Sequence, residues 1–344
     1  MERIWWDNIP NAARYVREIS DAVHEERSMV LILPPETPWR AALAQIVEEK
    51  LADIPDRSLR RISSPEGAPG EYLLRRYCKK ERQLAYRGTT SHAEFLAKEE
   101  ESVLHAAILW LEIERPEEAL AWVDFISAYQ GFAHKEAPRP SFILVLSEEC
   151  DKCRGRRGIQ YDSLAEKITE FDRYAFAILA ASDAVGQRHL KVYLANLAAT
   201  VCGDDIELSA ACSRRGVDFL RDPQGVLRQI AETGQRSDGT AFDIGEIGED
   251  ISRLIWRTQV KLVFPIIEDR RQHYVEELRA QLEARGDVPE EVEIGPLCYL
   301  AGRHEIQCTQ AAFNEIEMLK NARNALAHLS PLPFEMVDMI LRKQ

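Results

Sequence analysis

Short apolar runs alternate with amphipathic helical patterns over the first half of this chain. Runs of this kind, ended by prolines or charged residues, are typical of strands that are buried on both faces. They occupy Met29–Leu33, Ala106–Ile113, Phe142–Leu146 and Tyr174–Leu179, and Leu59–Ile62 reads as an edge strand. Because parallel strands need a crossover between them, the alternation predicts an α/β fold with a parallel sheet covered by helices.

The helical patterns carry their own start and stop signals. One helix is predicted to begin at Pro38 with Thr37 as its N-cap, and another to span Pro116–Tyr129. After Asp183 the pattern is helical throughout, and Pro265 is expected to kink or split the longest helix. The predicted helices of this second half cover residues 190–201, 204–215, 226–233, 249–284, 305–329 and 334–341.

The length of 344 residues exceeds one ordinary hydrophobic core, so several domains are expected. We predict an α/β domain over residues 1–182, a helical lid or winged-helix-like segment over 183–245, and a C-terminal helical domain over 246–344. The second boundary rests on four glycines between Gly234 and Gly248.

The net charge of −13 argues against a chain that coats nucleic acid over its whole surface. Residues 57–87 depart from this balance, with nine Lys or Arg against three Glu. One interpretation is a solvated surface. The other is a groove for an anion, RNA or DNA. The candidate ligands of the second interpretation are Arg75, Arg76, Lys79 and Lys80, together with Arg156 and Arg157 in a basic loop expected at the mouth of the third apolar strand.

The seven cysteines predict no metal site and no cofactor. Cys150 and Cys153 form a single C-x-x-C pair, whereas a structural zinc site needs four ligands. Scattered thiols in odd number are expected to be reduced in a cytoplasm. No apolar run approaches the length of a membrane span, so no membrane partner is expected.

The order of these elements resembles the core of AAA/STAND P-loop NTPases. The resemblance fails at the loop Leu33–Arg40, which has no glycine and no Gly-Lys-Ser/Thr. Its three prolines lack the N–H groups that would bind phosphate, and Glu36 would repel it. Glu112, Glu114 and Ser147 stand where such a family keeps its acids and its polar residue. We therefore predict an NTPase-like domain that has lost its Walker A motif and does not hydrolyse nucleotide.

The stretch Lys320–Pro331 contains Arg323, Asn324 and His328, and it resembles the R-N-x-x-x-H signature of HEPN domains. In catalytic members the resemblance implies a metal-independent ribonuclease, with the His moving a proton and the Arg stabilising the phosphate. Other HEPN-like modules only dimerise or dock, and the same residues could cap a helix end. Asn324 and His328 share a helix face, whereas Arg323 lies about 140° away from His328 around the axis. Arg323 and His328 would thus meet only if the arginine curls along the helix or if they act across a dimer.

The two resemblances together are typical of prokaryotic conflict systems, including anti-phage defence. Our leading expectation is a non-hydrolysing regulatory or interaction subunit that works with a protein partner in a multi-subunit system. It could form a homodimer through its C-terminal domain. The alternative is a metal-independent HEPN-type ribonuclease toxin that uses Arg323, Asn324 and His328.

Overall fold

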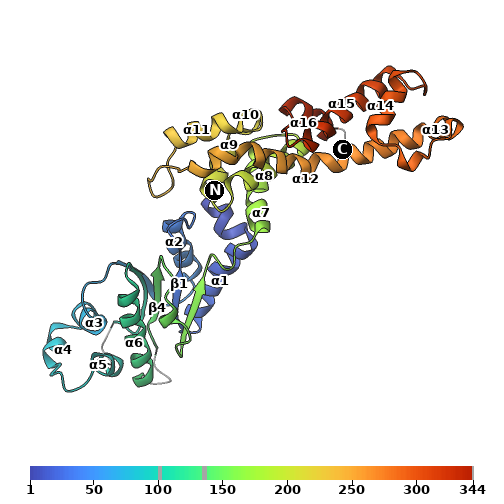
Figure 1. Cartoon of the computed structure of the whole chain (residues 1–344). Helices are drawn as coiled ribbons and strands as arrows, with labels where there is room; N and C mark the ends of the chain where they lie inside the picture. Colours follow the sequence, from blue (N-terminus) through green and yellow to red (C-terminus); the bar gives the residue numbers. More distant parts are fainter. Residues whose placement is uncertain (100–102, 134–137, 343–344) are drawn as a thin grey trace. The chain divides into compact units, whose positions relative to one another are not determined.

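The computed structural model describes residues 1–99, 103–133 and 138–342. The chain divides into two compact units, Met1–Asp172 and Arg173–Gln344 (Figure 1). The first unit contains the sheet and the second consists of helices. The expected α/β architecture followed by a helical region is therefore confirmed.

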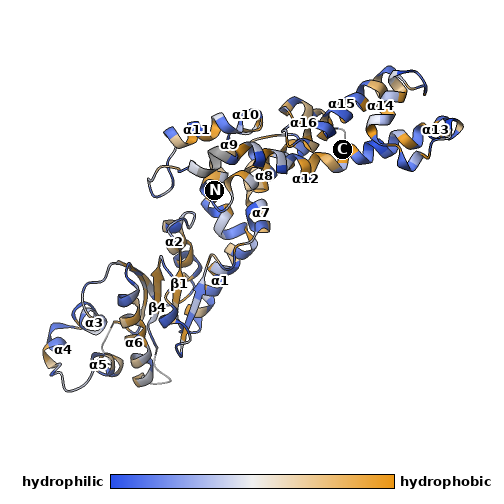
Figure 2. Ribbon diagram, viewed as in Figure 1, coloured by the Kyte–Doolittle hydropathy of each residue, from blue (hydrophilic) through white to orange (hydrophobic). Residues whose placement is uncertain are grey.

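The sheet of the first unit is parallel throughout and has the order β2-β3-β4-β1-β5. Every residue of β1 and β4 is buried, as expected for central strands with helices on both faces. These strands are orange, and so hydrophobic, in Figure 2. The strand bounds are β1 (Ser28–Ile32), β2 (Ser58–Ser63), β3 (Ala107–Ile113), β4 (Ser141–Leu146) and β5 (Ile159–Ser163).

Helices cover both faces of this sheet, with α1 and α6 on opposite sides of it (Figure 1). The helix α1 packs on β1 and α2, whereas α6 packs on β3, β4, α3 and α5. The α6 face is rich in aromatic rings, among them Trp122, Tyr129 and Phe142. The bounds are η1 (Ile4–Asn8, a π-helix), α1 (Pro10–His24), α2 (Arg40–Lys50), α3 (Pro69–Tyr77), α4 (Lys80–Ala85), α5 (His92–Lys98), α6 (Pro116–Phe132) and η2 (Asp151–Cys153).

The strand predicted at Tyr174–Leu179 is wrong, because these residues belong to the helix α7 (Glu170–Ala180). Thr169 and Asp172 form a capping box at its start: the Thr169 N–H donates to Asp172 Oδ2 (2.9 Å), and the Asp172 N–H to Thr169 Oγ1 (3.4 Å). The strand that completes the sheet is β5, which carries polar residues because it is an edge strand.

The helix predicted from Pro38 begins instead at Arg40. The Thr37 N–H donates to Pro34 O (2.9 Å), so the segment between them forms a turn rather than a helix start. Trp39 is the N-cap residue of α2, in the left-handed region with φ 46°, and no side chain caps the helix. The loop after β1 is therefore longer than its sequence suggested.

The second unit has one hydrophobic core that joins helices on both sides of residue 245. The long helix α12 packs on α8, α11, α15 and α16, so the segments 183–245 and 246–344, predicted as separate domains, share that core. Pro265 lies inside α12 without ending it. The bounds are η3 (Ala181–Asp183), α8 (Arg188–Cys202), α9 (Ile206–Arg214), α10 (Val217–Arg221), α11 (Pro223–Thr233), α12 (Gly245–Glu277), α13 (Arg279–Arg285), η4 (Pro289–Glu291), α14 (Ile294–Gly302), α15 (Gln310–Ala327) and α16 (Phe334–Leu341).

Candidate functional site

The carboxyl ends of the parallel strands bring the polar residues that follow them to one edge of the sheet. Ser63 Oγ donates to Glu112 Oε2 (3.4 Å) and Ser64 Oγ to Glu114 Oε1 (2.8 Å), which joins the ends of β2 and β3. Ser147 comes directly after β4. Open α/β sheets bind their ligands at this edge, and the predicted acids and serine do gather there.

Arg40 occupies the space between the end of β1 and the end of β4. Its Nη1 donates to Leu33 O (3.1 Å) and to Ser147 Oγ (2.9 Å). Burial lowers the pKa of the Arg40 guanidinium, and the Glu112 carboxylate acts in the opposite direction. The Arg40 side chain therefore places a positive charge at the carboxyl ends of β1 and β4.

The loop between β1 and α2 is poorly suited to cradle a phosphate. Pro34, Pro35 and Pro38 have no N–H, and the N–H of Thr37 is used within the loop. A cradle needs several free N–H groups that point at one oxygen cluster. Sequence reasoning recorded the missing glycines but overlooked Arg40. The available signal was an arginine at the start of the helix after a strand-ending loop.

The R-N-x-x-x-H residues lie at the end of α15, and the chain does not bring Arg323 to His328. Arg323 Nη2 donates to Glu293 Oε2 (3.2 Å), just before α14. Asn324 and His328 are exposed, and the N–H of His328 donates to the carbonyls of Asn324 and Ala325 as the helix ends. The three predicted catalytic side chains therefore form no site within one chain.

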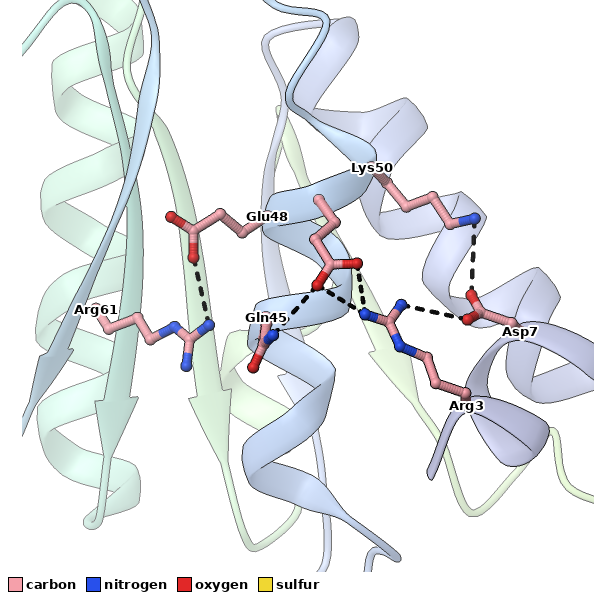
Figure 3. A network of polar contacts seen from close by, with 7 residues as sticks. Arg3, Asp7, Gln45, Glu48, Lys50 and Arg61 are labelled. Carbon is pink, nitrogen blue, oxygen red and sulfur yellow. Dashed lines mark hydrogen bonds and ion pairs between the residues drawn. The ribbon is translucent and has the colours of Figure 1, made fainter. Parts of the chain in front are cut away.

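The basic segment of residues 57–87 is largely paired inside the first unit. Arg61 donates to Glu48 of α2 (3.4 Å), next to a network in which Arg3 pairs with Glu49 (2.5 Å) and Asp7 (3.3 Å) (Figure 3). The other paired cations are Arg57 with the carbonyls of Val23 and Arg139, Arg60 over the Tyr77 ring, Arg75 with Glu71, and Arg82 with Glu99.

The four candidate ligands of that segment lie on α3 and around the start of α4. Arg75 and Arg76 are exposed in the last turn of α3, and both border a surface hollow. Lys79 and Lys80 are exposed at the N-terminal end of α4. These cations do not form a continuous basic groove. Glu48, Glu71 and Glu99 each pair with an arginine of the segment and neutralise its charge.

The basic loop with Arg156 and Arg157 lies at the amino edge of the sheet, which corrects its expected place at the mouth of the third apolar strand. It leads directly into Ile159, which pairs with Ser28 at the start of β1. Arg156 Nη2 contacts Asp124 Oδ1 of α6 (3.0 Å), and Arg157 is exposed. The loop is therefore remote from the strand ends where open sheets bind ligands.

The cysteines are buried or half-buried thiols. Burial raises the pKa of Cys153 to about 12 and that of Cys202 well above its usual value, so both stay protonated at neutral pH. Among the residues that the structure describes, no three His, Cys, Asp or Glu side chains gather as metal ligands would. No helix in the described part of the chain is long and apolar enough to cross a membrane.

No protein-family model and no curated protein matches the chain. Among solved structures, it is similar to a mutant of RuvB from Thermotoga maritima, with 14% identity and a TM-score of 0.33. That match covers 90% of this chain and 94% of the other.

Proposed function

We propose that this chain is a non-hydrolysing regulatory or interaction subunit built on a degenerate NTPase-like α/β unit. The observation that supports this most is Arg40, whose guanidinium bridges Leu33 O and Ser147 Oγ at the strand ends. A cation already fixed by the protein, beside a proline-rich loop, leaves no cradle for a triphosphate. The unit keeps the carboxyl edge of its sheet, which a partner protein can bind without nucleotide hydrolysis.

We propose that the chain acts together with a protein partner in a prokaryotic conflict system, such as anti-phage defence, in the cytoplasm. This role rests on the two resemblances in the sequence, to P-loop NTPases and to HEPN domains. Deleting the gene from a host that carries its whole neighbourhood should then abolish phage resistance. A neighbourhood without a nuclease, methylase or helicase, and no loss of resistance on deletion, would refute this role.

The first prediction is that the purified chain turns over neither ATP nor GTP. Glu112 is the last residue but one of β3, at the place of an acidic metal ligand, but its carboxylate accepts from Ser63 and the loop after β1 has no glycine. We expect the wild type and Glu112→Gln to release phosphate at the same background rate, and the variant to restore resistance in the deletion strain. A turnover that Glu112→Gln removes would contradict the proposal.

The second candidate function is the metal-independent ribonuclease, and the exposure of Asn324 and His328 at the end of α15 is the observation that favours it. Because Arg323 faces Glu293, a complete site would need the arginine of a second copy. Our second prediction is that the chain does not cleave RNA in EDTA and that His328→Ala hardly changes its stability, since the side chain is exposed.

The ribonuclease assay has a direct internal test for the two-copy site. If Arg323 and His328 act across a dimer, each single alanine variant should lose RNA cleavage by about 10²–10⁴-fold. Mixing Arg323→Ala with His328→Ala should then restore part of it, because mixed dimers contain one intact site. EDTA-resistant cleavage with this pattern of loss and rescue would overturn our prediction and establish the alternative.

A further inference from the structure

A surface hollow of about 360 Å³ lies beside the end of β2. It is bounded by the loop that follows β2 and by one side of α3, and it belongs to the carboxyl edge of the sheet. Its size falls at the lower end of small-ligand pockets, which measure about 300–1,000 Å³. The residues that line it are Ser63, Ser64, Pro65, Glu66, Tyr72, Arg75 and Arg76.

Arg76 provides the charge that is available in this hollow. Its neighbour Arg75 is paired with Glu71 one turn earlier on α3, whereas Arg76 has no acidic partner within the described residues. A guanidinium offers a planar fork of N–H donors that matches two oxygens of a phosphate. An exposed arginine in the wall of a hollow, next to an arginine that is already paired, is suited to bind an anion.

Tyr72 is held in place in the same wall. Its ring meets the buried ring of Trp122 edge-on, with centroids 6.1 Å apart. Burial raises the pKa of Tyr72, and the nearby charge of Arg76 acts in the opposite direction. The phenol therefore keeps its proton at neutral pH, and its hydroxyl can donate a hydrogen bond to the anion that Arg76 attracts.

The rest of the wall of the hollow carries negative charge and hydrogen-bond acceptors. Glu66 is exposed in the loop after β2, and the hydroxyls of Ser63 and Ser64 already donate to Glu112 and Glu114. This side therefore offers acceptors and would repel a second anionic group. A ligand that fits both sides has one phosphate and, beyond it, hydroxyl groups that donate.

We propose that this hollow binds a phosphate monoester that carries hydroxyl groups, the class of nucleoside 5′-monophosphates and sugar phosphates. Arg76 and the Tyr72 hydroxyl hold the phosphate, and Glu66 accepts a hydrogen bond from a hydroxyl of the sugar. The site is separate from the loop before α2, so it does not depend on nucleotide hydrolysis. Binding at this site would let a regulatory subunit respond to a small molecule.

The test is isothermal titration of the full chain with AMP, ribose 5-phosphate, inorganic phosphate and adenosine at millimolar concentrations. We expect the two esters to bind and adenosine not to bind. Arg76→Ala should weaken ester binding roughly tenfold or more, because a charged hydrogen bond is lost. Arg87→Ala is the matched control, since it removes the same charge from the same segment outside the hollow.

Two further variants separate the roles within the hollow. Tyr72→Phe should weaken the binding of all phosphate-bearing probes to a similar extent. Glu66→Gln should weaken the binding of the esters more than that of inorganic phosphate. Circular dichroism checks that each variant is folded. Equal losses in Arg76→Ala and Arg87→Ala would show a general charge effect and overturn the proposal. So would adenosine binding as well as AMP, or no binding of any probe, whatever the result of the hydrolysis assay.

Discussion

Replacing Gln259 by methionine should lower the free energy of unfolding of the second unit by roughly 2–4 kcal/mol. Gln259 lies on α12 with 1% of its surface exposed. Its Oε1 accepts from the Leu332 N–H (2.6 Å), and its Nε2 donates to Leu332 O (3.0 Å) and to the Tyr193 hydroxyl (3.0 Å). Methionine keeps the volume but leaves both main-chain groups of a buried loop residue without these partners.

The measurement is denaturant unfolding, combined with hydrogen exchange of the segment between α15 and α16. Gln310→Met is the matched control, because Gln310 is exposed and bonds Asn314 on the surface of α15 (2.8 Å). We expect the control to stay within a few tenths of a kcal/mol of the wild type. Similar losses of unfolding free energy for both variants, or unchanged hydrogen exchange around Leu332, would show that the hydrogen bonds of Gln259 do not hold this loop.

The sheet was predictable because its central strands leave no ambiguity in the sequence. β1, β3 and β4 are apolar runs that are too short for buried helices, and their bounds match the prediction closely. The edge strand β5 escaped notice because an edge needs fewer apolar residues. The apolar segment Tyr174–Leu179 fits the pattern of a buried strand, although the capping pair Thr169 and Asp172 before it signals a helix.

The candidate sites were less predictable, since their contacts join residues that are distant in sequence. The R-N-x-x-x-H resemblance groups Arg323 with His328, although helix spacing sets them about 140° apart. The structure pairs Arg323 with Glu293, thirty residues earlier. The charge of residues 57–87 was correctly counted, yet two of the acids that neutralise it, Glu48 and Glu99, lie outside that segment. Local patterns report which groups are present, whereas tertiary packing decides which of them remain available.

Asp172 should make the stability of the first unit depend on pH. The carboxylate is fully buried and accepts from the N–H and Nδ2 of Asn11 (3.1 and 2.7 Å) and from the N–H and Oγ1 of Thr169 (2.9 and 2.6 Å). It thereby ties the first turn of α1 to the start of α7. Burial acts to raise the pKa of Asp172, but these hydrogen bonds outweigh it and hold the pKa below its usual value.

A folded-state pKa below the unfolded value of about 3.9 means that the charged carboxylate adds stability above that pH. The contribution is lost as the pH falls through the folded-state pKa. Asp172→Asn should therefore cost roughly 2–4 kcal/mol at neutral pH, where charged hydrogen bonds are lost. The gap between the unfolding free energies of wild type and variant should narrow between roughly pH 5 and pH 2.

Asp56→Asn provides the control for this titration. Asp56 is exposed and has φ 59°, a left-handed conformation that asparagine adopts as readily as aspartate. Its substitution should leave the pH dependence of unfolding close to that of the wild type. If the gap between wild type and Asp172→Asn stayed constant down to pH 2, the stabilisation would come from packing rather than charge. The carboxylate would then not be what joins α1 to the start of α7.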